Sequence, residues 1–164
     1  MCSLSIKQDF KNDDQYNTPK EAWEMIIPFI PKNVTIWEAF MMGNTSSKSM
    51  DYLSELGCDV VGSPELDFFE NDLGDVIVSN PPYSIKKRIF KRLAELDKPF
   101  ILLLPVSTIT KQFTKILKRE FIQMIIPDKR IQFMKGEVQL KRIWFDTCFL
   151  TYKMNLEKDI TFIN

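Results

Sequence analysis

Histidine is absent from this chain of 164 residues, and glycine and cysteine are scarce, with five and three copies. Without histidine the protein has no imidazole to act as a general base, to complete a nucleophile triad or to bind a metal. The three cysteines, Cys2, Cys58 and Cys148, lack the spacing of a metal site, and their odd number argues against a disulfide framework. We therefore expect no metal, and we expect a reducing, intracellular location.

Long apolar runs are also missing. No stretch approaches the roughly 20 residues that cross a membrane, and the first residues lack the layout of a signal peptide. The hydrophobic content of 45% and the charged content of 27% are ordinary for a soluble globular protein. We expect residues 1–14 to be a mobile polar segment and residues 15–164 to form a single domain.

Short apolar runs alternate with helical patterns along the chain. The patterns predict strands at 34–37, 58–61, 76–79, 100–104 and 122–126, and helices at 19–27, 47–56, 85–96 and 111–119. The first helix is expected to have Thr18 as its N-cap and Pro19 at its first position. This alternation predicts an α/β fold, a Rossmann-like, doubly wound and mainly parallel sheet. The strand-rich end, at 131–134 and 144–153, predicts an antiparallel hairpin at one edge.

The tetrapeptide Asn80-Pro81-Pro82-Tyr83 directly follows the apolar run at 76–79. Neither proline has an N–H and both have a fixed φ, so the turn is rigid and its carbonyl groups are left unpaired. The Asn80 side-chain oxygen and the Pro81 carbonyl oxygen can accept both hydrogens of one amino group, while Tyr83 stacks on the attached ring. The alternative is a plain turn that ends a strand.

This tetrapeptide resembles the catalytic motif of amino-group methyltransferases that depend on S-adenosylmethionine, chiefly the adenine-N6 DNA enzymes. Among these the chain is most similar to small phage-type or virus-type members that lack a target-recognition domain. The resemblance implies a class I methyltransferase fold, with S-adenosylmethionine as the cofactor and Asn80, Pro81, Pro82 and Tyr83 as the catalytic residues. The same motif also serves RNA and protein-glutamine methyltransferases.

The segment 37–44 stands where this family has its cofactor loop, Glu/Asp-Pro-Phe-x-Gly-x-Gly. Glu38, Phe40 and Gly43 match that pattern, and the resemblance assigns them to cofactor binding. Ala39 replaces the proline, however, and Met42 and Asn44 stand where small residues are expected. A β-carbon at such positions opposes positive φ and close approach of a ligand. A loop that no longer fits the cofactor is therefore the alternative.

Two further segments resemble cofactor-binding parts of the family. Asp67 and Phe68 match the segment that holds the cofactor's adenine, although a helix cap followed by core aromatic residues explains them as well. Glu65 is the available acid for the ribose hydroxyl groups. The segment Tyr16, Thr18 and Pro19 resembles the Tyr-x-Thr-Pro segment near the methionine end of the cofactor.

Charge is unevenly distributed although the net charge is zero. Residues 1–82 contain 5 basic and 14 acidic side chains, whereas residues 83–164 contain 17 and 8. A basic half suits a polyanion such as DNA, and two charged faces that merely solvate the domain are the alternative. The residues expected to contact nucleic acid are Lys86, Lys87, Arg88, Lys129, Arg130, Lys141 and Arg142.

The combined hypothesis is a DNA adenine-N6 methyltransferase whose target base is flipped out of the duplex or already single-stranded. The chain has no room for a target-recognition insert, so specificity is low or comes from a protein partner. RNA adenine and protein glutamine remain alternative acceptors. A nucleic-acid-binding relative that has lost cofactor binding is a further alternative.

Overall fold

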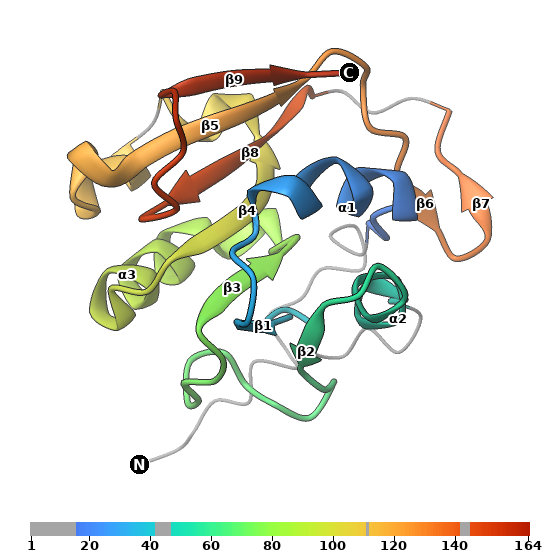
Figure 1. The fold of residues 1–164 in the computed structure, drawn as a ribbon, viewed down its shortest axis with the longest axis horizontal. Coiled ribbons are helices and arrows are strands. Elements are labelled where there is room, and N and C mark those ends of the chain that lie inside the picture. The colour runs from blue at the N-terminus through green and yellow to red at the C-terminus, as the bar shows by residue number, and fades with distance from the viewer. Residues whose placement is uncertain (1–15, 42–46, 111, 142–144) are drawn as a thin grey trace.

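The computed structural model describes residues 16–41, 47–110, 112–141 and 145–164, and a seven-stranded sheet lies at its centre (Figure 1). The strands run in the order β2-β1-β3-β4-β8-β5-β9, and all are parallel except β8, which is antiparallel to β4 and β5. Their bounds are β1 Thr35–Trp37, β2 Asp59–Val61, β3 Val76–Ser79, β4 Phe100–Pro105, β5 Ile122–Pro127, β8 Thr147–Tyr152 and β9 Ile160–Ile163.

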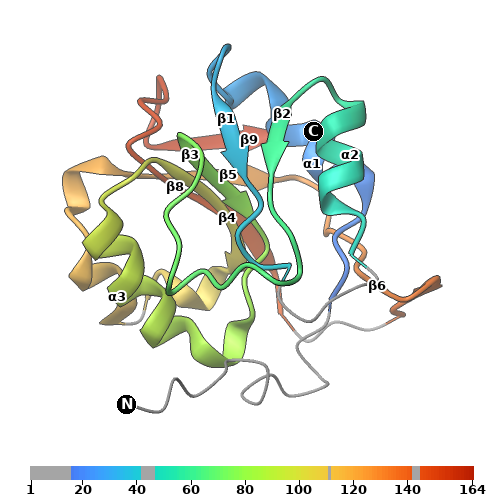
Figure 2. The same ribbon diagram turned by 90° about the horizontal axis from the view of Figure 1, so that it is seen from below.

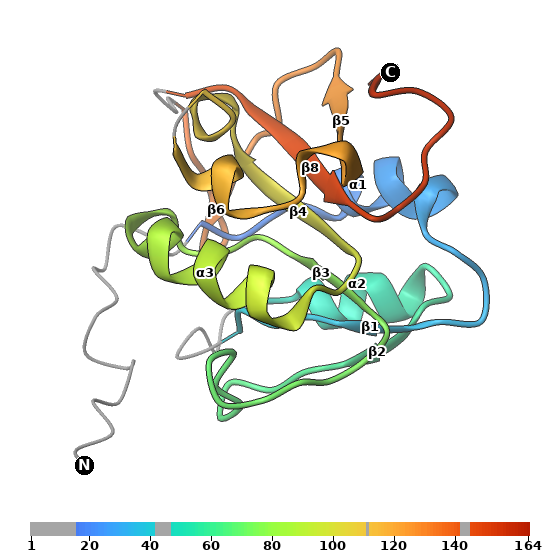
Figure 3. The same cartoon turned by 90° about the vertical axis from the view of Figure 1, so that its left-hand side faces the viewer.

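Helices cover both faces of the sheet, with α1 and α2 on one side and α3 on the other (Figure 2). Trp23 of α1 and Leu53 of α2 are buried against one face, whereas Ile89 and Phe90 of α3 are buried against the opposite face, where α3 lies over β3 and β4 (Figure 3). The α-helices are α1 Lys20–Ile26, α2 Ser49–Glu55 and α3 Lys86–Leu96. The 3-10 helices are η3 Ile27–Phe29, η4 Tyr83–Ile85, η5 Val106–Thr108, η6 Gln112–Ile116 and η7 Arg119–Phe121.

This arrangement confirms the α/β, doubly wound and mainly parallel fold class. The inner strands β3 and β4 are mainly apolar because both of their faces are covered, and every residue of these two strands is buried. No helix in the described ranges is long and apolar enough to span a membrane.

A C-terminal antiparallel hairpin is present, as expected, but the antiparallel strand of the main sheet lies elsewhere than predicted. The strand β8 lies inside the sheet, between β4 and β5, and the edge next to β5 is formed by β9, which the sequence patterns did not predict. Only four residues long, β9 is too short to show a clear period, and it forms because it pairs with the open side of β5. A separate two-stranded hairpin, β6 Met134–Lys135 and β7 Val138–Gln139, extends from the body of the protein (Figure 1).

Two local predictions were wrong. Residues 112–121 form the short 3-10 helices η6 and η7 in place of the single helix expected at 111–119, of which residue 111 lies outside the described ranges. The hydroxyl group of Thr114 donates to the carbonyl oxygen of Ile109 at 3.4 Å, a bond that competes with regular helix formation.

The helix α1 begins at Lys20 with Pro19 in extended conformation as its N-cap, so Thr18 lies one residue too early to cap it.

Candidate active site

Glu38 follows the carboxyl end of β1, and residues 80–83, here called the Asn80 turn, follow the carboxyl end of β3. These strands are parallel neighbours, with Trp37 paired to Ile77, so the residues that follow them leave the sheet at the same edge. The Ser79 hydroxyl group donates a hydrogen bond to Oε1 of Glu38, and both residues are almost fully buried. The acid of the predicted cofactor loop is therefore joined to the residue that precedes Asn80.

Burial changes the acidity of Glu38. Its side chain is 3% exposed, and loss of solvation raises the pKa of the carboxyl group to about 7. Hydrogen bonds from Ser79, the Phe40 N–H and Ser49 favour the ionised form and oppose this shift, but burial outweighs them. No ion pair among the described residues includes Glu38. Near neutral pH the site therefore contains a carboxyl group that is easily switched between its neutral and ionised forms.

Gly62 closes this site from the end of β2. A β-carbon at this position would lie 2.6 Å from the Glu38 carbonyl oxygen and 3.1 Å from Sδ of Met50. The close approach lets the backbone at Glu38 bond to β2, where the Glu38 N–H donates to the Val61 carbonyl oxygen at 2.9 Å. The sequence shows this residue only as a glycine directly after a predicted strand. Its packing role could not be predicted, because that role depends on the contact with Glu38, which is distant in the sequence.

We expect Gly62→Ala to destabilise the protein by roughly 1–3 kcal/mol, because the backbone oxygen that it meets cannot move aside without distorting β1. Chemical denaturation of both proteins measures this change. Gly57→Ala is the matched control, since a β-carbon there meets nothing within 4 Å and only the positive φ of 88° opposes it. Gly57→Ala thus reports backbone strain alone, and a Gly62→Ala variant as stable as the wild type would contradict the packing role of Gly62.

The Asn80 side chain is held at both ends. Its Oδ1 accepts a hydrogen bond from the Tyr83 hydroxyl group at 2.9 Å, and its Nδ2 donates to the Tyr16 carbonyl oxygen at 3.2 Å. Pro81 and Pro82, the next two residues, are both buried. An amide oxygen has two lone pairs, so Oδ1 retains the capacity for a second donor. The turn thus presents a pre-oriented acceptor.

Aromatic rings surround this acceptor. The rings of Tyr16 and Tyr83 are stacked with centroids 6.4 Å apart, and Phe145 meets both edge-on, at 6.0 Å and 5.5 Å. Phe133 packs against Tyr16 at 5.8 Å. The sequence-based prediction included Tyr16 and Tyr83 but missed Phe133 and Phe145, whose positions follow from the path of the chain between β5 and β8. The group offers planar apolar surface next to an amide oxygen.

The segment expected to hold adenine is folded as a capped turn. Oδ1 of Asp67 accepts a hydrogen bond from the Phe69 N–H at 2.8 Å. Phe68 is fully buried, with its ring 4.5 Å from Phe40 and 5.5 Å from Trp37 between ring centroids. This is the arrangement of a cap followed by core aromatic residues, and the assignment of Asp67 and Phe68 to the cofactor stays a prediction.

Of the other predicted cofactor residues, the structure describes Glu65 but not Gly43. Glu65 is exposed and accepts a hydrogen bond from the Ser63 hydroxyl group. Gly43, together with Met42 and Asn44, lies outside the described residues. The central part of the predicted cofactor loop therefore remains untested.

Thr18 and Pro19 line a cavity of about 500 Å3 on the α2 side of the site. The cavity is lined by Asn17, Thr18, Pro19, Ser47, Lys48, Asp51, Tyr52, Met134, Gly136 and Glu137. Its Ser47 hydroxyl group lies 3.0 Å from that of Ser49, which in turn bonds to Glu38. The Thr18 hydroxyl group is buried and has no hydrogen-bond partner in the described part of the chain. A buried polar group without a partner is costly unless a ligand or water satisfies it.

These features fit the amino-acid end of S-adenosylmethionine. That end carries an ammonium and a carboxylate group, and the cavity offers Lys48, Asp51 and Glu137 as charges of both signs. Thr18, another lining residue, has a buried hydroxyl group without a partner in the described part of the chain. A larger cavity of about 600 Å3 lies at the opposite end of the strands, where it is lined by residues such as Val34 and Cys58. We favour the smaller cavity as the cofactor site because ligands of open α/β sheets bind at the carboxyl ends of the strands.

Basic residues at the start of α3 have two different roles. The Lys86 ammonium group lies 5.9 Å from the centroid of the Tyr83 ring and donates to the Thr108 hydroxyl group at 3.4 Å, so it belongs to the immediate surroundings of the Asn80 turn. The Arg88 guanidinium group lies over the Phe69 ring at 4.6 Å and thereby holds the turn that contains Asp67. Neither side chain is simply a solvated charge.

The remaining residues expected to contact nucleic acid lie on the surface. Arg130 forms an ion pair with Asp146, with Nη2 and Oδ1 2.6 Å apart. The side chains of Lys87, Lys129 and Lys141 are exposed. Arg142 lies outside the described residues. Contact of these residues with nucleic acid stays a prediction.

Comparison with known proteins gives little further information. No protein-family model matches this chain, and no curated protein matches it. Among solved structures, it is similar to a "putative methyltransferase" from Thermoplasma acidophilum, with 16% sequence identity and a TM-score of 0.43 over 90% of this chain and 69% of that one. A similarity of this degree carries no argument about activity, so the function has to be inferred from the site itself.

Proposed function

We propose that this protein transfers a methyl group from S-adenosylmethionine to the N6 amino group of adenine in DNA. One observation carries the proposal: the buried strand β3 ends in an Asn80 turn that is joined through Ser79 to the buried acid Glu38. An oriented amide oxygen, aromatic rings and an ionisable acid thus meet at the carboxyl edge of the sheet.

Asn80 and Pro81 would act on the amino group of the substrate. Their two oxygens accept its two hydrogens, which draws the nitrogen lone pair out of the ring and makes the nitrogen more nucleophilic. Tyr83 and Phe145 provide the planar surface on which the base would be held. Alignment of the reacting atoms supplies most of the rate increase in such a transfer.

The cofactor would supply a methyl carbon activated by a positively charged sulfur. The chain would hold its amino-acid end in the cavity lined by Thr18, where the charged side chains of Lys48 and Asp51 are available. Glu38, one residue beyond β1, would oppose the positive charge when ionised. A competing proposal is that the protein is a relative that binds nucleic acid without the cofactor. It is favoured by Met42 and Asn44, which stand where the family pattern has small residues.

Calorimetric titration with S-adenosylmethionine, followed by transfer assays with a labelled methyl group, tests the proposal. We expect saturable binding and N6-methyladenine in single-stranded DNA, with duplex DNA, RNA and a glutamine-containing peptide as competing acceptors. Methylation of RNA or peptide alone would keep the chemistry and change the substrate. Absence of cofactor binding would overturn the enzyme proposal in favour of the non-catalytic relative.

The exposed side of α3 provides a separate test of the DNA proposal. We expect Lys87→Glu to weaken DNA binding and to lower the slope of its salt dependence by about one, because one contact with a phosphate group is lost. Lys32→Glu is the matched control, since it makes the same charge change on an exposed residue at the opposite end of the strands. Fluorescence anisotropy over a range of salt concentrations measures both. Equal losses would show that only net charge matters.

A further inference from the structure

The strand β9 forms an open, apolar edge of the sheet. It is one of the two edge strands of the seven-stranded sheet and, in the described structure, pairs only with β5 (Figure 1). Phe162 is 68% exposed and Ile160 is 45% exposed. In the parallel register Ile160 lies beside Met124 and Phe162 beside Ile126, so both exposed side chains are on the same face of the sheet.

The backbone of β9 is available on its outer side. The carbonyl oxygens of Asp159 and Ile163 accept hydrogen bonds from the N–H groups of Met124 and Asp128, at 2.8 Å and 2.7 Å. In a parallel ladder alternate residues face the neighbouring strand, so Asp159, Thr161 and Ile163 face β5. Ile160 and Phe162 consequently direct their N–H and C=O groups toward the open edge.

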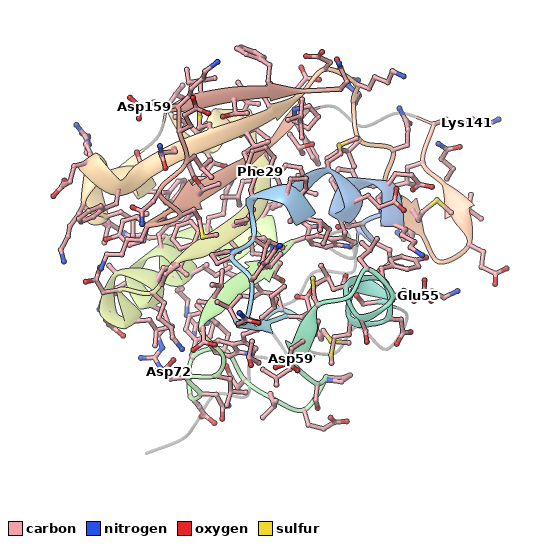
Figure 4. All side chains as sticks on the ribbon, viewed as in Figure 1. Phe29, Glu55, Asp59, Asp72, Lys141 and Asp159 are labelled. Carbon is pink, nitrogen blue, oxygen red and sulfur yellow. The ribbon has the colours of Figure 1, made fainter. Side chains whose placement is uncertain are left out.

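The opposite edge of the sheet has a different character. Its strand, β2, is three residues long and begins with the exposed Asp59, and neither Val60 nor Val61 is an exposed side chain. Asp59 and Asp159, at the two edges, lie on opposite sides of the molecule (Figure 4). Soluble proteins usually protect an open edge with charge, proline, a bulge or a short strand. No residue of β9 is charged or a proline, although both kinds occur elsewhere in the chain.

We propose that β9 is a dimerisation edge, and that its partner is β9 of a second copy of this chain in antiparallel orientation. In an antiparallel pair, residues that exchange backbone hydrogen bonds must face the shared edge in both copies. Ile160 and Phe162 face this edge, so even-numbered residues must pair with even-numbered residues. The centred register with this property places Thr161 on the two-fold axis and pairs Ile160 with Phe162 of the partner subunit. The same pairing recurs on the other side of the axis.

The side chains of β9 would also be compatible with this register. Each Ile160 would pack against the partner subunit's Phe162 on one face of the joined sheet, which buries the two most exposed apolar side chains of the strand. Lys158 would lie opposite the partner subunit's Asn164, so no like charges are placed together. The pairing uses the same edge in both copies and therefore closes at two subunits. The contact is short, which predicts an association that depends on protein concentration.

Sedimentation velocity of the full chain across a dilution series tests the proposal. We expect a reversible monomer–dimer equilibrium that Phe162→Lys abolishes, leaving a monomer at every concentration. Val138→Lys is the matched control, because Val138 is 69% exposed and lies on the separate hairpin. Thermal unfolding of each variant shows whether its fold is retained. A wild-type protein that stays monomeric, or a Phe162→Lys variant that still dimerises, would overturn the proposal.

A cysteine variant tests the register itself. On the two-fold axis, the two copies of residue 161 would form a pair without mutual hydrogen bonds, in which Cα atoms are about 4.5 Å apart. That distance suits a disulfide, so Thr161→Cys should give a covalent dimer under mild oxidation. Ile163→Cys, which would face Asp159 of the partner subunit, should not. Equal cross-linking of both variants would contradict the register.

Discussion

Asn80→Ala is expected to reduce methyl transfer by at least about 10²–10³-fold, the loss typical of removing one group that stabilises developing charge. The variant removes the side-chain amide, whose oxygen accepts from the Tyr83 hydroxyl group and whose nitrogen donates to the Tyr16 carbonyl oxygen. Because the cofactor cavity lies on the α2 side of the site, affinity for S-adenosylmethionine should change little. Single-turnover kinetics and calorimetry measure the two quantities separately.

Tyr83→Phe is the control for this prediction. It removes the hydroxyl group that donates to Asn80 but retains the ring that would support the base. We expect a smaller loss of transfer, because the amide is still held through its Nδ2 atom. A Tyr83→Phe variant as inactive as Asn80→Ala would show that orientation of the amide dominates. Loss of cofactor binding in Asn80→Ala would place the cofactor next to the turn.

Glu38→Gln is expected to stabilise the free protein at alkaline pH and to have little effect near pH 4. Burial raises the pKa of Glu38 from its ordinary value of 4.5 to about 7. Between these values the unfolded chain has lost a proton that the folded protein still holds, so the favourable contribution of Glu38 falls as pH rises through this window. It is fully present below pH 4.5 and is lost above pH 7.

The shift corresponds to roughly 3 kcal/mol of stability, or a difference in melting temperature on the order of 6–12 °C for a domain of this size. Glutamine retains an oxygen for Ser79 and the Phe40 N–H, and its amide group can donate to Ser49. Thermal unfolding of wild type and variant over a pH series measures the difference, in which other titrating groups cancel. A difference independent of pH would contradict the buried, shifted carboxyl group.

The same substitution should weaken binding of a positively charged cofactor, since only ionised Glu38 can oppose its charge. Gain of stability together with loss of affinity would identify Glu38 as a group kept for function at a cost in stability. Gain of stability with unchanged affinity would support the relative that does not use the cofactor.

Local sequence features predicted the parts of this fold that depend on near neighbours. The apolar run of β3, the rigid turn from Asn80 to Tyr83 and the helix α3 lie where the patterns placed them. The fold class followed from the alternation of such elements. The 3-10 helices at 112–121 were missed because local propensity favours one helix there, whereas tertiary contacts prevailed, such as that of Phe113 with Phe90 of α3, with ring centroids 5.9 Å apart.

The sequence by itself determined the alternating order of strands and helices and supplied the candidate site residues. Tertiary structure alone decided that Glu38 bonds to Ser79, 41 residues away, and that Asn80 bonds to Tyr16, 64 residues away. It also placed β8 inside the sheet and β9 at its edge. Turn chemistry and periodicity act over a few residues, whereas desolvation of a carboxyl group and the choice of a strand partner depend on segments that folding brings together.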